Sequence, residues 1–324
     1  MRGFLETAGE YLAIECSPSW VADLVAEGAG GQLESAQSRT ASVHVHIEEE
    51  RRAFDTRGWQ LLARGAWRRN GEVVIENACT SGFDLHFNDE REQPEFTYRW
   101  RPPARERAAA HLLRTRFRLL ARATLMQYPV LWCAGLRACV PLHASACVVG
   151  AATPLVVAQS GIGRSTLLLA EVARGGHATG DNLAVTDGST VWGMVEPARA
   201  EGGGGRSVTH GRRERPFPHS VPGLVPDRIV VVERGAADEA SLSACSGDTA
   251  ARSLVTSTYM AGELRRYWPF AATLAAGSGR GPSHPAIADV VSALTARLPA
   301  SLLRLGRRGE SCLSELLNTV EVAA

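Results

Sequence analysis

The stretch PLVVAQSGIGRSTLLLAEVARGG (154–176) decides the fold of this 324-residue chain. Its first part is short, apolar and rich in valine, which predicts a buried strand at 155–157. A glycine-rich turn follows at 160–163, and the helical pattern of 165–174 ends at Gly175-Gly176. Strand, glycine-rich loop and helix in this order are typical of an α/β fold whose loop amides can hold an anion.

The loop departs at two positions from the phosphate-binding pattern G-x-x-x-x-G-K-[ST]. Ala158 stands where the pattern has its first glycine, and Arg164 stands where it has lysine. A broad guanidinium is a poor substitute for a compact ammonium group. Ser165 keeps a hydroxyl that can bind Mg²⁺, although a simple helix cap is the alternative. The predicted anion-binding residues are Ser160, Gly161, Ile162, Gly163, Arg164, Ser165 and Thr166.

Composition narrows the class of protein. With 45% apolar and 21% charged residues, the chain resembles an ordinary soluble globular protein. A net charge of +1 gives no indication of a nucleic-acid or membrane partner. The seven cysteines form no C-x-x-C pair and no signal-peptide pattern opens the chain, so we expect reduced thiols in a cytoplasmic protein. All 35 basic residues are arginine, which indicates GC-rich codon usage.

Three regions are predicted along the chain: a β-rich region at 1–100, an α/β core at 101–235 and a helical region at 236–324. In the first, ASVHVHIE (41–48) alternates as a strand does, and Asn70-Gly71 predicts a hairpin turn. His44 and His46 share one face of that strand. They are either two metal ligands or part of a solvated face, and the second is favoured because no third ligand is nearby.

Two arginine-rich segments are candidates for binding an acidic partner. A helix predicted at 104–127 places four arginines on one face, which is either a basic groove wall or a solvated surface. Residues 197–226 look irregular, and form either a mobile substrate loop or a surface insertion. The arginines of the helix are Arg107, Arg114, Arg118 and Arg122, and those of the loop are Arg206, Arg212, Arg213 and Arg215.

Residues 138–195 resemble the catalytic core of the HPr kinase/phosphorylase family and its shorter relatives. PLHASACVVG (141–150) is similar to the family's strand with its histidine, SGIGRS to its phosphate loop, and RGG (174–176) to its "RG". Asp181-Asn182 stands at the place of the family's Asp-Asp pair. The interval from His143 to Ala158 is 15 positions and that from Arg164 to Asp181 is 17, and both agree with the family.

The resemblance implies ATP- and Mg²⁺-dependent phosphate transfer to a serine of a peptide or protein, by a homo-oligomer. It makes Asp181 the base, His143 its helper and Ser165 the Mg²⁺ ligand. From the residues alone, His143 can equally be a core histidine and Asp181 a turn residue. Asn182 departs from the family, because an amide can neither act as a base nor give Mg²⁺ a charged ligand.

Two functions follow from these departures. The favoured one is a degenerate relative in which ATP and Mg²⁺ binding is weak or lost. Such a protein recognises a peptide or protein partner, for example as an adaptor in the biosynthesis of a ribosomally made, modified peptide. The alternative is an active ATP-dependent serine kinase. The first is favoured because each well-placed charged group is worth roughly 10²–10³ in rate. In either case we expect His143 and Asp181 to converge on the loop.

Overall fold

The computed structural model describes residues 1–89, 93–201, 205–208, 212–307 and 312–322, and it is mixed α/β, as predicted. The chain forms two compact units from segments distant in sequence, whereas three consecutive regions were predicted. Unit 1 comprises Met1–Arg137, Val208–His210 and Glu263–His284. Unit 2 comprises Ala138–Ser207, Gly211–Gly262 and Pro285–Ala324.

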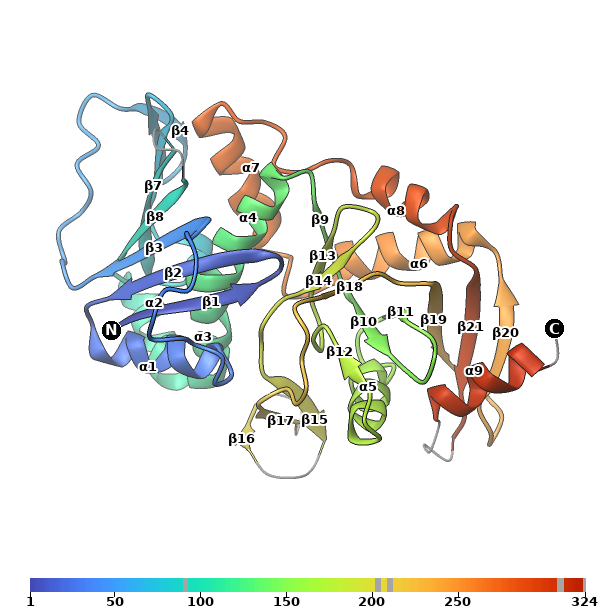
Figure 1. The fold of residues 1–324 in the computed structure, drawn as a ribbon. Coiled ribbons are helices and arrows are strands. Elements are labelled where there is room, and N and C mark those ends of the chain that lie inside the picture. Colours follow the sequence, from blue (N-terminus) through green and yellow to red (C-terminus); the bar gives the residue numbers. More distant parts are fainter. Residues whose placement is uncertain (90–92, 202–204, 209–211, 308–311, 323–324) are drawn as a thin grey trace. The chain divides into compact units, whose positions relative to one another are not determined.

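Unit 1 is built on an eight-stranded sheet in the order β1-β2-β3-β8-β7-β6-β5-β4 (Figure 1). The predicted alternation is confirmed in β3, where Val43, Val45 and Ile47 are buried. Asn70 and Gly71 both have positive φ and join β5 to β6, as a tight hairpin requires. The strands are β1 (Arg2–Thr7), β2 (Glu10–Cys16), β3 (Val43–Glu48), β4 (Gln60–Ala63), β5 (Ala66–Arg69), β6 (Glu72–Ile75), β7 (Phe83–Asn88) and β8 (Glu95–Trp100).

The single helix predicted at 104–127 differs from the structure in two ways. The chain breaks at Leu113, whose φ of −115° and ψ of 51° are not helical, and it continues through Pro129. Proline is tolerated there because it lies in the first turn of α4. The helical elements of unit 1 are α1 (Ser19–Gly28), η1 (Ala78–Thr80), α2 (Ala104–Leu112), α3 (Arg114–Arg122), the π-helical turn η2 (Ala123–Gln127), α4 (Tyr128–Leu136) and α7 (Tyr267–Ser278).

The four helix arginines therefore do not form one solvent-facing row. Arg107 and Arg114 are exposed, but they lie on either side of the break. Arg118 forms an ion pair with Glu27 at 3.2 Å, and Arg122 is only 5% exposed. Their binding of a peptide stays a prediction, but it cannot use a continuous basic face.

Unit 2 is centred on a six-stranded sheet in the order β12-β10-β11-β19-β21-β20 (Figure 1). The three middle strands β11, β19 and β21 run parallel to one another. Helices α5 and α9 pack on one face through a shared apolar core, and α6 packs on the other. The elements are β10 (Ala144–Val148), β11 (Pro154–Ala158), α5 (Arg164–Ala173), β12 (His177–Ala178), β19 (Arg228–Arg234), β20 (Ser241–Cys245), α6 (Gly247–Met260), α8 (Ile287–Thr295), β21 (Ala300–Leu305) and α9 (Leu313–Val322).

Two smaller sheets complete unit 2. One contains β9 (Val140–Leu142), β13 (Ala184–Thr186), β14 (Val191–Gly193) and β18 (Gly223–Leu224), and the other contains β15 (Ala198–Glu201), β16 (Arg206–Ser207) and β17 (Arg212–Arg215). The second sheet corrects the prediction of an irregular segment at 197–226, part of which (202–204 and 209–211) lies outside the described residues. Glycine and arginine hid these strands, because their side chains give no apolar alternation.

The polar clusters of unit 1 do not form a metal site. His46 lies between Glu15 and Glu95, and His44 contacts the Gln93 side chain at 2.6 Å. In the described part of the chain, no three His, Cys, Asp or Glu residues are grouped to hold a metal ion.

All seven cysteines are free, and burial raises the pKa of Cys16 to about 11. No helix of the described residues is both long and apolar enough to cross a bilayer.

The close packing of unit 2 can be tested at Gly193. A Cβ added there would lie 1.6 Å from the Thr179 carbonyl oxygen, which belongs to the backbone leading to Asp181. We expect Gly193→Ala to lower the free energy of unfolding by about 3 kcal/mol, because a backbone atom cannot easily move aside. Urea unfolding measures this. Gly262→Ala is the control, since its Cβ would meet no atom within 4 Å. Equal midpoints for the two variants would contradict the packing described.

Candidate anion-binding site

The site lies at the carboxyl edge of the parallel strands of unit 2. Strands β11, β19 and β21 end at Ala158, Arg234 and Leu305, so the residues that follow them meet at one edge. Antiparallel pairing of Ala144 with Val157 brings His143 to the same edge. In open α/β sheets this edge is where ligands bind.

The glycine-rich loop has the backbone that its sequence predicts. Gly161 and Gly163 have φ values of 84° and 121°, which side chains other than glycine rarely allow. Ala158 is an ordinary strand residue paired with Val232, so the missing first glycine does not distort the loop.

The N-terminus of α5 has no side-chain cap, so its first backbone N–H groups can bind a ligand. Gly163 is the N-cap and no side chain caps the helix, so the interpretation of Ser165 as a cap is wrong. The first N–H groups of α5 have no acceptor within the helix, and the helix dipole is positive at this end.

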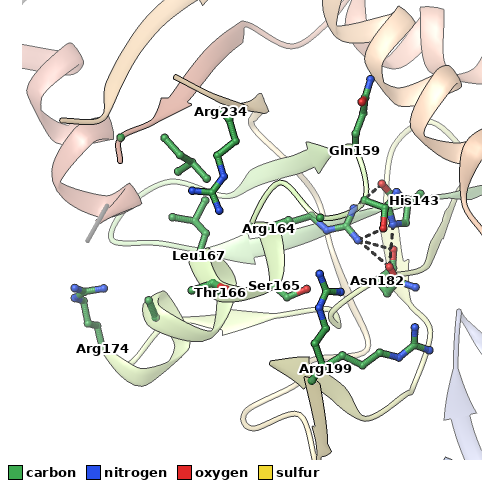
Figure 2. A pocket seen from close by; sticks show the side chains of 17 residues that line it. His143, Gln159, Arg164, Ser165, Thr166, Leu167, Arg174, Asn182, Arg199 and Arg234 are labelled. Carbon is green, nitrogen blue, oxygen red and sulfur yellow. Dashed lines mark hydrogen bonds between the residues drawn. The ribbon is translucent and has the colours of Figure 1, made fainter. Parts of the chain in front are cut away.

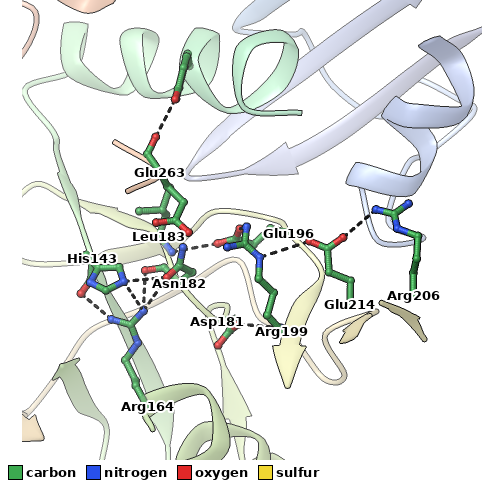
Figure 3. Close-up of polar contacts among 11 residues, drawn as sticks. His143, Arg164, Asp181, Asn182, Leu183, Glu196, Arg199, Arg206, Glu214 and Glu263 are labelled. Carbon is green, nitrogen blue, oxygen red and sulfur yellow. Dashed lines mark hydrogen bonds and ion pairs between the residues drawn. The ribbon is translucent and has the colours of Figure 1, made fainter. Parts of the chain in front are cut away.

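Arg164 turns inward from the loop rather than outward. Its side chain is 6% exposed, and its Nη1 donates to the His143 carbonyl oxygen at 2.7 Å (Figure 3). Its Nη2 donates to Asn182, to the carbonyl oxygen at 3.2 Å and to Oδ1 at 3.1 Å. The guanidinium thus joins the start of α5 to the segments before β10 and after β12.

Two polar contacts of the His143 ring are made through one nitrogen. Its Nε2 lies 2.9 Å from Asn182 Oδ1 and 3.1 Å from Arg164 Nη2. Toward the guanidinium, which can only donate, Nε2 acts as an acceptor, and toward Oδ1 it acts as a donor, according to the tautomer. The other ring nitrogen, Nδ1, is buried. This arrangement favours a structural histidine over a helper in proton transfer.

Asp181 is buried and is not among the residues that line the cavity beside the loop. It is 2% exposed, and its Oδ2 accepts the Arg199 backbone N–H at 3.1 Å. Asn182 lines the cavity. Of the two residues expected to converge on the loop, the lining therefore includes His143 and does not include Asp181.

A cavity of about 540 Å³ opens beside the loop (Figure 2). Every predicted loop residue lines it except Ile162, which packs on the apolar core. Among the described residues that line it there are five arginines and no aspartate or glutamate. The arginines are Arg164, Arg174, Arg199, Arg212 and Arg234. The cavity is thus suited to an anion.

Three of these arginines were not predicted as binding residues from the sequence, and Arg174 among them was noted only within RGG (174–176). Arg234 ends β19, and the rule that sites form at the carboxyl ends of parallel strands could have found it. Arg199 had no such signal, because β15 was not predicted. It lies 3.4 Å from Glu214 and 3.6 Å from Glu196, so its position depends on the three-stranded sheet.

Mg²⁺-ATP fits this set of side chains poorly. Magnesium in nucleotide sites is usually held by one or two carboxylates together with phosphate oxygens. The described lining offers the Ser165 and Thr166 hydroxyls but no carboxylate. Among its described residues it also contains no Phe, Tyr or Trp side chain on which a purine could stack.

No family model and no curated protein matches the chain. Its function is therefore inferred from the geometry of the cavity.

The structural role of Arg164 predicts a stability effect. Arg164→Met should lower the free energy of unfolding by about 3 kcal/mol, because the buried His143 and Asn182 oxygens lose a charged donor. Arg234→Met is the matched control in the same cavity. Arg234 is exposed, so its loss should cost less than about 0.5 kcal/mol. Urea unfolding of both variants decides the matter, and a cost at Arg164 no larger than at Arg234 would refute the role.

Proposed function

We propose that this chain is an HPr-kinase-like recognition protein that binds an anionic group of a peptide or protein and does not transfer phosphate. One observation carries the proposal. The residue at the lysine position of the phosphate loop, Arg164, is buried against His143 and Asn182. A side chain that holds the scaffold together is not available to follow a phosphoryl group during transfer.

The remaining parts of a kinase site support the same proposal. Phosphoryl transfer depends on positioning and on charge stabilisation by metal ions and a catalytic base. Asp181 is buried and does not line the cavity, and Asn182 lines it with an amide that cannot take a proton. The histidine nearby has its Nε2 engaged with that amide.

Binding, by contrast, is well provided for. Loop amides and the positive end of α5 attract anions whatever the side chains are. Arginine forks add bidentate recognition of carboxylate or phosphate oxygens. An acidic or phosphorylated segment of a peptide suits these donors, which agrees with an adaptor role in the biosynthesis of a modified peptide.

The proposal predicts no phosphotransfer and weak nucleotide binding by the wild type. Calorimetry with Mg²⁺-ATP and an ATPase assay test both. Arg164→Lys combined with Asn182→Asp should raise nucleotide affinity about tenfold or more, because it restores the compact ammonium group of the phosphate-loop pattern and a charged metal ligand. Each single variant is the control for folding, by its urea midpoint. Tight wild-type binding with turnover would instead establish the active serine kinase.

A further inference from the structure

We infer that the cavity binds a phosphate-class anion, free or carried on a side chain, without a divalent cation. This inference rests on the proposed function and names the ligand chemistry of the same site. It follows from the charges of the described lining, from the elements that carry them and from the small number of apolar side chains among these residues.

The arginines of the described lining supply the positive charge that a metal ion would otherwise supply. A magnesium ion would add two positive charges to a cavity that already holds five guanidinium groups and, within its described lining, no carboxylate. Arg174 and Arg199 have acidic neighbours outside the lining, at 3.9 Å and 3.4 Å. The Arg212 and Arg234 side chains form no hydrogen bond or ion pair with another described side chain or backbone group. These two can neutralise a dianion directly.

The arginines approach the loop from separate elements (Figure 2). Arg234 comes from the end of β19, and its Nη2 is 3.7 Å from where a Cβ on Gly163 would lie. Arg199 and Arg212 come from the paired strands β15 and β17. A group held at the loop amides can therefore be contacted from more than one side.

This donor set suits a phosphoryl group better than a carboxylate. A phosphate monoester offers three oxygens and nearly two negative charges, so it can accept from amides and from several forks together. A carboxylate has two oxygens and one charge. The apolar part of the described lining is limited to Leu167, Ala170 and Leu305, which gives a nucleoside little to bind.

Calorimetry with inorganic phosphate and pyrophosphate, in EDTA and in excess Mg²⁺, tests the inference on the full chain. Both anions should bind in EDTA, and Mg²⁺ should weaken pyrophosphate binding because it neutralises the anion. Arg212→Gln should weaken binding about tenfold, as expected for a lost charged hydrogen bond. The control is Arg252→Gln, an exposed arginine of α6 outside the cavity, which should change affinity less than twofold.

A serine phosphopeptide and its unphosphorylated form separate the two sources of the group. A phosphopeptide that binds more tightly than phosphate indicates a group carried by a peptide, and equal affinity indicates a free anion; both outcomes support the site. Binding that requires Mg²⁺, absence of binding, or equal losses in the Arg212 and Arg252 variants would overturn it. Phosphotransfer by the wild type would overturn the proposed function alone, provided that metal-free binding persists.

Discussion

The buried guanidinium of Arg164 is the contact on which the site of unit 2 depends. It belongs to the first residue of α5, yet its hydrogen bonds go to the segments that flank β10 and β12. Three pieces of chain that are distant in sequence therefore share one donor. Buried carbonyl oxygens need such donors, because an unsatisfied polar group in the interior is costly.

That use of Arg164 changes the chemistry that the loop can support. A phosphate loop normally offers backbone amides together with one mobile cation. Here the amides remain, the cation of the loop is fixed inside, and most of the other positive charge of the described lining comes from Arg199, Arg212 and Arg234. These three come from the end of β19 and from the three-stranded sheet, so their charge belongs to the fold around the loop rather than to the loop motif. Fixed charges of this kind suit the binding of an anion, which is the function that we propose.

The local elements could be predicted where pattern and propensity agree. The strand, loop and helix at 154–174, the alternation of β3 and the turn at Asn70-Gly71 all follow from residue type and spacing. The break at Leu113 could not be foreseen, because the helical pattern continues across it. The direction of the Arg164 side chain was equally hidden. It depends on acceptors at His143 and Asn182, which only the folded sheet brings near. The same holds for Asp181, since neighbouring positions after a strand can point to opposite sides.

A crystal structure of the wild-type chain grown with pyrophosphate would show whether Arg164 belongs to the scaffold or to the anion. We expect the Arg164 guanidinium to stay within hydrogen-bond distance of the His143 carbonyl oxygen and Asn182, while the anion contacts the amides at the start of α5 and at least one of Arg199, Arg212 and Arg234. A structure in which Arg164 leaves His143 and Asn182 to bind the anion would contradict it.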